Sequence, residues 1–553
     1  MSVNARIAEI FDEMASVLEL TGANPFRIGA FSKVARIVRD YPVDLATLAD
    51  DHKKLTAIDG IGEGSAKKII EFVQTGRVAE HDELLTTIPP GLTNLLKIPG
   101  LGPKTIYRFW KEADVTDLET LKAKLASGEL AKLPRMGEKT LQNISKSIEF
   151  IATASERMRL GEAMPIAEDT IALLQTEFGV TQIEFAGSLR RGCETIGDID
   201  ILAVAADPAA LYRHFQSLPQ VQQVLVAGES KCSVRFNSGI QVDLRIFEKN
   251  AFGAALMYFT GSKAHNIVLR ERAIKMGFRL NEYGLFKDVP DDKSGKPIHQ
   301  RGQKAVASKT EEDIYTALKL PFIPPELRED TGEFKLTKTP HLITLEDIRA
   351  ELHAHTTASD GHWSITQLAQ AAADRGFHTI AVTDHSKSSV QANGLSPERL
   401  RAHIKAIRKV AKQLPGITIL AGAEVDILTD GSLDYDDELL AELDIVVASP
   451  HASLKQEPAL ATKRLLKAVT HPLVHILGHP TGRIINRREG LNPAMNEIIA
   501  AAKEHNTALE INANHLRLDL RDAHVHAVVE AGGLIAIDTD AHGPGDLDEL
   551  RYG

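Results

Sequence analysis

Residues 187–202 decide the fold of the middle of the chain and have the sequence Gly-Ser-Leu-Arg-Arg-Gly-Cys-Glu-Thr-Ile-Gly-Asp-Ile-Asp-Ile-Leu. Asp198 and Asp200 lie two residues apart in the apolar second half, which predicts a strand with both carboxylates on one face. Such carboxylates repel each other unless a cation lies between them, and Mg²⁺ held by carboxylates and substrate phosphates is a common solution. A third acid, Asp243, lies in another predicted strand at 240–246. The pattern predicts a mixed sheet that carries a metal site of three carboxylates, and helices are expected before it at 141–160 and 170–178.

The first half of the same stretch has the features of a phosphate site. A Gly187-Ser188 turn precedes two adjacent arginines, Arg190 and Arg191. Backbone amides in such a turn and guanidinium groups both bind phosphate oxygens. Together with the paired acids, they suit in-line nucleotidyl transfer assisted by two metal ions. The alternative is an exposed acidic strand end beside an unrelated basic turn, and the third strand acid favours the site.

Length and composition limit the class of protein. A chain of 553 residues is too long for one core, so several domains are expected. No apolar run reaches about 18 residues, and the N-terminus lacks the apolar core of a secretory signal, so no membrane partner is expected. Two cysteines, Cys193 and Cys232, suit a reducing compartment and predict a cytoplasmic location. The net charge of -11 does not exclude a local basic surface.

Glycine turns between short helices recur before residue 150. In a helix-hairpin-helix, such a turn directs backbone amides at a DNA phosphate, and the next helix adds its N-terminal dipole. One turn of this kind is often only a helix corner, but three of them, each followed by lysine, favour sequence-independent binding of the DNA backbone. The predicted hairpins lie at 55–70, 96–105 and, in a weaker form, 133–140, and the predicted DNA-binding glycines are Gly60, Gly62, Gly100 and Gly102.

From residue 350 onward, predicted strands and helices alternate, and histidine is concentrated there. Five of the 21 histidines precede position 341, and the other sixteen lie from position 341 on. His353 and His355 alternate out of one face of a strand, as ligands of one cation must. Later His, Asp and Glu residues follow apolar runs, which indicates a βα-barrel with its chemistry at the carboxyl ends of the strands. One histidine near a strand is usually without function, but this series favours a multinuclear site for Zn²⁺ or Mn²⁺.

The middle of the chain resembles the family X DNA polymerases of the nucleotidyltransferase superfamily. The likeness is carried by residues 187–202 and extends to 257–262, Asn266, Arg270 and 277–283. It implies that Tyr258, Phe259 and Gly261 line the sugar pocket, and that Lys231 contacts primer or template. Gln241 stands where animal members carry an arginine, which leaves open how Asp243 is tuned as a base. The implied catalytic ligands of Mg²⁺ or Mn²⁺ are Asp198, Asp200 and Asp243, and the implied nucleotide contacts are Gly187, Ser188, Arg191, Gly197, Tyr258, Phe259, Gly261, Asn266 and Arg270.

The resemblance also covers the first hairpin, where some family members carry a lysine that forms a Schiff base and removes a 5′ deoxyribose phosphate. Lys68 is the matching residue, and a desolvated lysine could do this chemistry. A lysine that only contacts phosphate is an equally good interpretation, and Gly64 replaces a flanking lysine of the animal members.

Residues 348–553 resemble the PHP (polymerase and histidinol phosphatase) family. The resemblance implies a cluster of up to three Zn²⁺ or Mn²⁺ ions, and Arg483 could hold the scissile phosphate, with a surface ion pair as its alternative. Bacterial polymerases joined to such a domain show 3′–5′ exonuclease and sometimes apurinic-site endonuclease activity. The implied metal ligands are His353, His355, Asp360, His385, Glu424, His451, His479, Asp540 and His542.

The prediction is a multidomain α/β protein: a bacterial-type family X DNA polymerase with a C-terminal PHP nuclease, active in gap filling during base excision repair. We expect gapped or primer-template DNA and dNTPs as partners, and a monomer. The alternatives are a DNA-docked nuclease with an inactive polymerase core and a PHP phosphatase for a small ester. The predicted parts are helical DNA-binding domains at 1–80 and 81–150, a nucleotidyltransferase palm at 151–258, a nucleotide-binding subdomain at 259–322, a linker at 323–347 and the PHP (βα)-barrel at 348–553.

Overall fold

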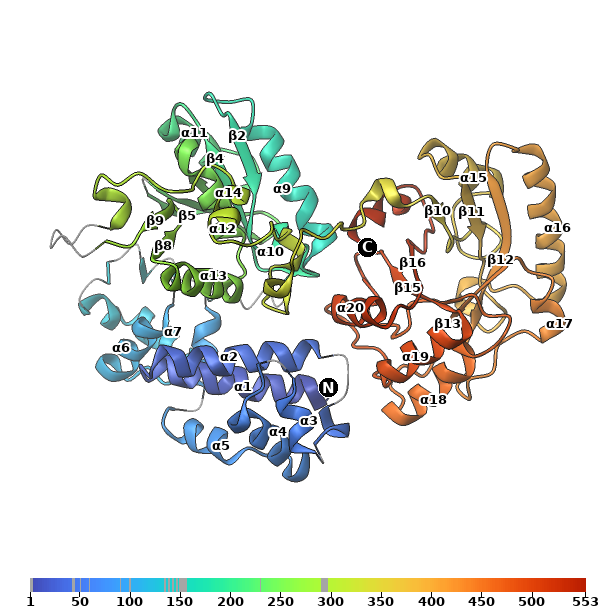
Figure 1. The fold of residues 1–553 in the computed structure, drawn as a ribbon, viewed down its shortest axis with the longest axis horizontal. Helices are drawn as coiled ribbons and strands as arrows, with labels where there is room; N and C mark the ends of the chain where they lie inside the picture. The colour runs from blue at the N-terminus through green and yellow to red at the C-terminus, as the bar shows by residue number, and fades with distance from the viewer. Residues whose placement is uncertain are drawn as a thin grey trace. The chain divides into compact units, whose positions relative to one another are not determined.

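The computed structural model divides into two compact units, which are described separately below (Figure 1). The N-terminal unit comprises Val3–Arg39 and Leu48–His341, and the C-terminal unit is built on Leu342–Gly553. No helix in the part of the chain that the structure describes is both long and apolar enough to cross a membrane. The described residues are 3–41, 45–49, 51–58, 60–89, 91–98, 101–133, 136–137, 140–141, 144–145, 148, 157–228, 230–289 and 297–553.

Helices make up the first part of the N-terminal unit, as predicted. The first helix buries Ile7, Phe11 and Met14 at helical spacing, so burial of one apolar face stabilises it. Gly62 and Gly102 are the N-caps of the helices that follow the first two predicted hairpins. Gly100, most of the third hairpin and most of a helix predicted at 141–160 lie outside the described residues. The helices are α1 (Val3–Leu20), α2 (Pro25–Asp40), α3 (His52–Thr56), α4 (Glu63–Thr75), α5 (Ala79–Thr86), α6 (Pro103–Ala113) and α7 (Leu118–Ala126).

A five-stranded mixed sheet follows these helices along the chain, with the strand order β2-β4-β7-β6-β5. The pair β4–β7 is parallel and the other pairs are antiparallel, which confirms the predicted mixed sheet. The helix predicted at 170–178 is wrong in position, because the helix in this region, α9, spans Leu160–Leu174. The chain then turns through positive φ at Phe178 and Gly179. The other elements are β1 (Met158–Arg159), β2 (Gln182–Phe185), α10 (Gly187–Arg190), β3 (Thr195–Ile196), β4 (Asp198–Val204), α11 (Pro208–Gln216), β5 (Val221–Ala227), β6 (Cys232–Phe236) and β7 (Gln241–Ile246).

A smaller subdomain follows the sheet and has its own apolar core, which includes Met257, Leu269 and Ile314. Part of the predicted linker packs on this subdomain. Glu333, which belongs to that linker, has a buried carboxylate that accepts a 2.7 Å hydrogen bond from Nδ1 of the buried His265. The elements are α12 (Phe252–Thr260), α13 (Lys263–Lys275), β8 (Phe278–Asn281), β9 (Gly284–Lys287) and α14 (Glu311–Ala317).

The C-terminal unit is a parallel seven-stranded sheet whose strand order, β10 to β16, equals the order along the chain. A parallel bridge between Ala354 and Ala541 joins the first and last strands, so the sheet is nearly closed into the predicted barrel, with helices outside it (Figure 1). The strands are β10 (Ala350–Glu351), β11 (Thr379–Val382), β12 (Thr418–Asp426), β13 (Ile445–Ser449), β14 (Ile476–Leu477), β15 (Ala508–Asn512) and β16 (Ile535–Asp538). The helices are α15 (Ile365–Asp374), α16 (Pro397–Gln413), α17 (Asp437–Leu440), α18 (Pro458–Val469), α19 (Met495–His505) and α20 (Asp522–Ala531).

Gly253 allows α12 to approach the N-terminus of α14, and this contact generates a stability prediction. A Cβ atom at Gly253 would lie 2.5 Å from the carbonyl carbon of Lys309 and against the backbone of Thr310. We expect Gly253→Ala to destabilise the packing of α12 on α14 by about 1–3 kcal/mol, because a backbone cannot yield as a side chain can. Hydrogen–deuterium exchange in peptides of both helices measures the effect. Gly64→Ala is the control, since nothing lies within 4 Å of that helical glycine, and equal protection in both variants would contradict the prediction.

Candidate active sites

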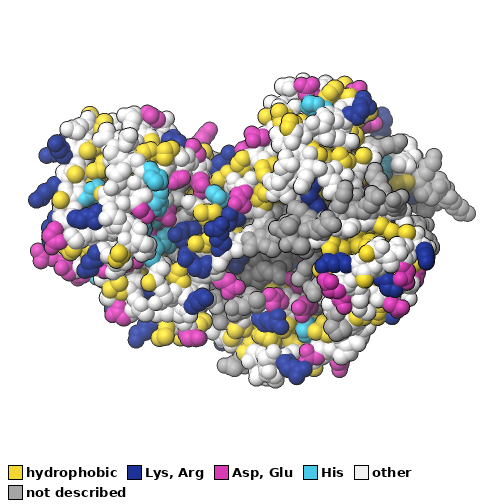
Figure 2. Space-filling model, turned by 180° about the vertical axis from the view of Figure 1, so that it is seen from behind, with side chains coloured by type: hydrophobic (Ala, Val, Ile, Leu, Met, Phe, Trp, Pro, Cys, Tyr) yellow, Lys and Arg dark blue, Asp and Glu magenta, His cyan; other side chains and the backbone are white. Residues whose placement is uncertain are grey.

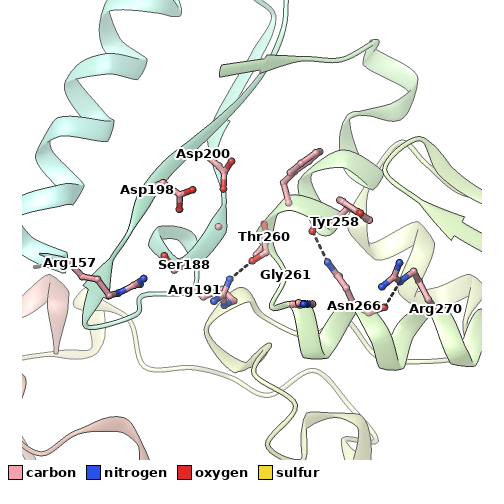
Figure 3. Close-up of a pocket in the computed structure, with 13 residues that line it drawn as sticks. Arg157, Ser188, Arg191, Asp198, Asp200, Tyr258, Thr260, Gly261, Asn266 and Arg270 are labelled. Atoms are coloured by element: carbon pink, nitrogen blue, oxygen red, sulfur yellow. Dashed lines mark hydrogen bonds between the residues drawn. The ribbon is translucent and has the colours of Figure 1, made fainter. Parts of the chain in front are cut away.

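A pocket of about 450 Å³ lies at the amino end of β4 and brings most of the predicted nucleotide site together (Figure 3). Asp198 and Asp200 come from β4, and Ser188 and Arg191 come from α10 and the residue after it. The subdomain that begins with α12 supplies the opposite wall. The predicted residues that line the pocket are Gly187, Ser188, Arg191, Asp198, Asp200, Tyr258, Phe259, Gly261, Asn266 and Arg270.

The three predicted metal-binding acids meet across the β4–β7 pair. Asp200 lies directly opposite Asp243 in the parallel register. Burial, followed by the charges of Asp198 and Asp243, raises the pKa of Asp200 to about 7. Burial and the charge of Asp243 also raise the pKa of Asp198. The carboxylates therefore resist carrying their charges together, and a bound divalent cation would relieve that repulsion.

Asp243 is bound by Gln241 of its own strand, β7, and by Lys231, which precedes β6. Its Oδ1 accepts a 2.9 Å hydrogen bond from Nε2 of Gln241, and its Oδ2 forms an ion pair with Lys231. Lys231 is thus placed beside the acid, and its contact with primer or template stays a prediction. Gln241 therefore offers this candidate base a neutral amide, and Lys231 offers it a positive charge.

Hydrogen bonds orient the far wall of the pocket (Figure 3). Asn266 donates from Nδ2 to the carbonyl oxygen of Tyr258 at 2.6 Å, and Arg270 donates from Nε to the carbonyl oxygen of Asn266 at 3.3 Å. The buried Oδ1 of Asn266 accepts no hydrogen bond from a described residue. Arg191 donates from Nη1 to the carbonyl oxygen of Thr260 and from Nε to Glu329, both at 2.6 Å. A nucleotide would enter between side chains that are already positioned.

Arg157 was missed by the sequence reasoning and lines the pocket beside Asp198. It donates from Nη2 to the carbonyl oxygen of Thr195 at 2.7 Å. A Cβ atom at Gly197 would lie 2.7 Å from Nη1 of Arg157, so the glycine makes room for this guanidinium. Gly197 is therefore placed against Arg157 and does not itself line the pocket. No motif surrounds Arg157 in the sequence, and only the β1–β3 pairing brings it to the site.

Arg190 does not line the pocket, although the next residue, Arg191, does. It donates to Thr260 Oγ1 at 2.7 Å and forms two hydrogen bonds to Glu311, at 3.0 and 2.7 Å. Glu311 also accepts a 2.5 Å bond from the fully buried Arg328. The expectation that Arg190 holds a phosphate is thus corrected, since a buried carboxylate shared by two arginines already binds it. The cluster ties α10, which carries Ser188, to α14.

The shared carboxylate generates a second prediction. We expect Glu311→Ala to lower the free energy of unfolding of the N-terminal unit by about 3–5 kcal/mol, because it leaves two guanidinium groups buried without a counter-charge. Urea unfolding of the full chain measures this. Glu312→Ala, at the exposed next position of the same helical turn, is the matched control. A loss in Glu311→Ala no larger than in Glu312→Ala would contradict the account.

The predicted lyase residue, Lys68, is engaged in the structure. Its Nζ lies 2.7 Å from Glu80 Oε2 and 5.6 Å from the ring centroid of Phe31, and its side chain is 16% exposed. Burial raises the pKa of Glu80, but Lys68 and Arg27 outweigh burial and lower it overall. Lyase chemistry at Lys68 stays a prediction. Gly60 has a φ of 90°, a conformation that favours glycine in the turn of the first hairpin.

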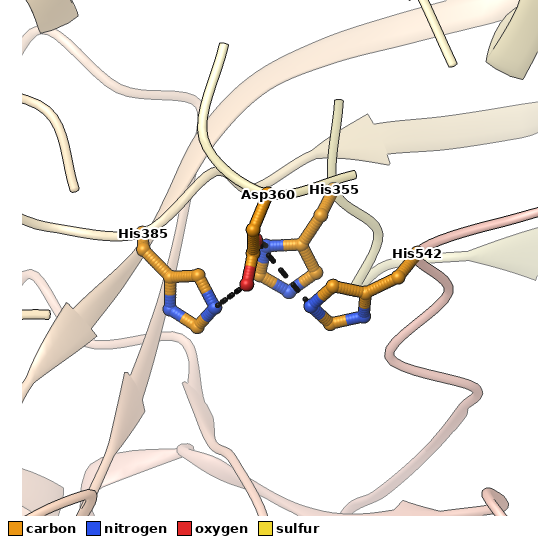
Figure 4. A group of neighbouring side chains, drawn as sticks. All are labelled: His355, Asp360, His385 and His542. Atoms are coloured by element: carbon orange, nitrogen blue, oxygen red, sulfur yellow. Dashed lines mark ion pairs between the residues drawn. The ribbon is translucent and has the colours of Figure 1, made fainter. Parts of the chain in front are cut away.

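The C-terminal unit gathers its predicted ligands at one end of the barrel, in three groups of three or four residues whose ligand atoms lie within 4.8 Å of one another. Figure 4 shows the first group, in which Asp360 faces His385 and His542, each with Nε2 at 3.5 Å from an oxygen of Asp360. His479 joins the cluster through a 2.9 Å hydrogen bond from Nε2 to Glu424. The groups are His355, Asp360, His385 and His542; His353, His355, Glu424 and Asp540; and His385, Glu424 and His451.

The donor set fits divalent metal ions. Nε2 of His353, Nδ1 of His355 and Nδ1 of His479 are buried and form no hydrogen bond with any described residue. A buried polar atom without a partner costs free energy, which a coordinated ion would recover. Imidazole and carboxylate ligands together suit Zn²⁺ or Mn²⁺. Because His355, His385 and Glu424 belong to two groups each, the ions would share ligands.

The charges of the cluster also favour the binding of cations. Burial opposes protonation of the histidines, but the carboxylates of Glu424 and Asp360 raise the pKa of His385 to about 11. Likewise, despite burial, Glu424 and Asp426 raise the pKa of His451 to about 9. Burial lowers the pKa of His355 to about 4. Anionic carboxylates thus draw positive charge to the site, and ions can supply it while the imidazoles stay neutral as ligands.

Carboxylates behind the ligands hold the imidazole rings, and the sequence reasoning did not assign them. Glu510 accepts a 2.6 Å hydrogen bond from Nδ1 of His353, and Asp426 accepts a 2.9 Å bond from Nδ1 of His451. Carboxylates in this place fix the tautomer and orientation of a metal-binding histidine. Glu510 is a charged residue within the apolar strand β15, and a charge in such a run was the available signal in the sequence. Arg483 donates to the carbonyl oxygen of Leu518, and its contact with phosphate stays a prediction.

The fold and the two sites define a nucleotidyltransferase joined to a metal-dependent phosphoesterase. Family models match four parts of the chain: a helix-hairpin-helix domain at 2–78, a SAM-like helix-hairpin-helix tandem at 92–149, the DNA polymerase beta thumb at 255–329 and the PHP domain at 351–514.

Similarity to curated proteins identifies the family. The DNA polymerase/3'-5' exonuclease PolX of Bacillus subtilis (strain 168) is 37% identical over 99% of this chain and 94% of its own length. Probable phosphatases of Thermoanaerobacter sp. (strain X514) and Proteus mirabilis (strain HI4320) are 29% and 30% identical over 35% of this chain and 78% of their own lengths. The chain belongs to the family X DNA polymerases that carry a C-terminal PHP domain.

Proposed function

We propose that this enzyme fills short gaps in DNA by template-directed nucleotidyl transfer and trims 3′ ends by hydrolysis in its PHP domain. The observation that supports the first activity most is the register that sets Asp200 opposite Asp243 beside the pocket containing Arg191. The second activity is supported by the three ligand groups at one end of the barrel. The substrates would be gapped or primer-template DNA and dNTPs, as in base excision repair.

In the polymerase reaction, the primer 3′ oxygen bonds to the α-phosphorus of a dNTP, and pyrophosphate leaves. Asp198, Asp200 and Asp243 would hold Mg²⁺ or Mn²⁺, which when bound supplies positive charge to the triphosphate and acidifies the primer hydroxyl. Asp243 accepts the proton of that hydroxyl. Arg191 and the amides at Gly187-Ser188 bind triphosphate oxygens.

Other residues of the pocket position the nucleotide before the reaction. The guanidinium of Arg157, beside Asp198, adds positive charge where the triphosphate would lie. Tyr258, Phe259 and Gly261 pack against the sugar, while Asn266 and Arg270 reach the minor-groove edge of the new base pair. Because Asn266 is already held by the Tyr258 carbonyl oxygen, it loses little conformational entropy on binding.

In the nuclease reaction, a water oxygen bonds to the phosphorus of the terminal phosphodiester. The bond to the 3′ oxygen of the preceding nucleotide breaks, that oxygen takes up a proton, and a nucleoside 5′-monophosphate leaves. The nine predicted ligands would hold up to three Zn²⁺ or Mn²⁺ ions, which when bound lower the pKa of water to roughly 7. Glu510 and Asp426 keep the ligand rings of His353 and His451 in place for this.

A labelled primer on gapped DNA, with Mg²⁺ or Mn²⁺ and with or without dNTPs, tests both activities. We expect the primer to grow with dNTPs and to shorten without them. Substituting both Asp198→Asn and Asp200→Asn should reduce growth by at least about 10³-fold, because the shape is kept and the metal-binding charge is lost, while shortening persists. Asp169→Asn, at an exposed position of α9, is the control. Shortening without any growth would leave a DNA-docked nuclease.

A substitution of His355 should separate the two activities in the opposite direction, because His355 belongs to two of the three ligand groups. We expect His355→Ala to abolish shortening and to lower the Mn²⁺ or Zn²⁺ content measured by mass spectrometry, with growth unchanged. His505→Ala, at the exposed end of α19, should change neither. Phosphate release from a small phosphomonoester is measured in parallel. Rapid release from that ester with no shortening of DNA would favour a phosphatase and refute the proposed nuclease.

A further inference from the structure

Arg517 lies in the loop that follows β15, next to the metal-ligand cluster of the C-terminal unit. Its Nε is 3.7 Å from Oδ2 of the predicted ligand Asp540, and its side chain is 21% exposed. The guanidinium is therefore close to the ligands and open to solvent, which is where a substrate would approach.

Among the described residues, the guanidinium of Arg517 forms only a long ion pair, with Asp540. It donates no hydrogen bond to any described residue, and 3.7 Å is too long for one to Asp540. Neighbouring arginines are different, since Arg483 donates to the carbonyl oxygen of Leu518 and Arg488 donates from Nε to that of Gly482 at 2.9 Å. Of these three arginines, Arg517 alone keeps its donors for a ligand.

Two loops are joined so that Arg517 has a defined position. One oxygen of the buried Asp519 accepts hydrogen bonds from the amide and hydroxyl of Thr481 and from the amide of Gly482, at 2.9–3.0 Å. The amide of Ile485 donates to the carbonyl oxygen of Leu516 at 2.8 Å. The backbone of Asn512 also pairs with that of Asp519. These hydrogen bonds lie on both sides of Arg517 and restrict the position of its backbone.

The surroundings of Arg517 favour an anion. Burial and then the charge of Arg517 lower the pKa of Arg488, so these guanidinium groups repel each other. On the face shown in Figure 2, histidine side chains of the C-terminal unit reach the surface, and Lys and Arg side chains lie close to them. A phosphate oxygen would relieve the repulsion between the arginines, as a metal ion would relieve that between the carboxylates. Guanidinium groups bind phosphate through paired hydrogen bonds, and an ammonium cannot reproduce that geometry.

We propose that Arg517, rather than Arg483, binds a non-bridging oxygen of the phosphate group that the PHP site hydrolyses. This proposal rests on the proposed nuclease function. Arg483 then acts as a positioning residue, because it holds the carbonyl oxygen of Leu518, which is next to Arg517 in the chain. The site would bind the phosphate group by a charge placed beside Asp540, independently of the predicted DNA-binding hairpins.

The test uses the full chain loaded with Mn²⁺ and three substitutions, Arg517→Ala, Arg517→Lys and Arg483→Ala. Binding of inorganic phosphate is measured by calorimetry, and hydrolysis is measured with bis(4-nitrophenyl) phosphate and with a labelled primer. We expect Arg517→Ala to weaken phosphate binding by at least about 10-fold and to reduce kcat/KM for both substrates by about 10²-fold. Added guanidinium ion should restore part of the activity. Arg517→Lys should fall in between, and Arg483→Ala should lose less than Arg517→Ala.

Primer extension and bound Mn²⁺ should stay unchanged in Arg517→Ala, and Arg487→Ala, at an exposed position of the neighbouring loop, should resemble the wild type. Unchanged phosphate affinity in Arg517→Ala, a greater loss in Arg483→Ala, or a fall in Mn²⁺ content would each overturn the assignment. Wild-type protein that binds phosphate but does not shorten DNA would refute the proposed nuclease instead. The calorimetric comparison of the variants would then still decide the role of Arg517.

Discussion

Repulsion between buried carboxylates is the constraint on which both sites depend. In the N-terminal unit, the parallel register of β4 and β7 sets Asp200 opposite Asp243, and burial with the neighbouring charges raises the pKa of Asp200 to about 7. In the C-terminal unit, Glu424 and Asp540 are buried among histidines, several of whose ring nitrogens form no hydrogen bond with any described residue. Neither arrangement is favourable without added positive charge. The requirement for divalent ions therefore follows from how the strands are paired.

Basic residues that are close in the chain have different surroundings in the fold. Arg190 and Arg191 are adjacent, yet Arg190 is bound by the buried Glu311, whereas Arg191 lines the pocket and bonds to Glu329 and to the carbonyl oxygen of Thr260. A similar difference separates Arg483, which donates to a backbone carbonyl oxygen, from Arg517, which among the described residues forms only a long ion pair with Asp540. A guanidinium can serve as a buried structural ion or as a phosphate ligand, and its partner decides which. Identity of residue type alone does not distinguish the two uses.

Much of the fold and of the two sites could be predicted from local patterns. The alternation around Asp198 and Asp200 correctly predicted a strand, β4, and the strand–helix alternation after residue 350 correctly predicted a parallel barrel. The predicted helix at 170–178 was misplaced, because the end of α9 is set by a turn at Phe178 and Gly179. Arg157 and Glu510 were missed, since neither belongs to a motif and both reach their sites through strand pairing.

The sequence by itself determined the elements and the chemistry they carry, because side-chain direction along a strand or helix depends only on spacing. It thus specified which acids share a face, where glycine permits a hairpin turn and which histidines follow strands. Only the tertiary structure decided the charge partners. Arg190 meets Glu311 from 121 positions away, and His353 meets Glu510 from 157 positions away. Electrostatic and hydrogen-bonding interactions act through space, so these partners were chosen by packing and not by position in the chain.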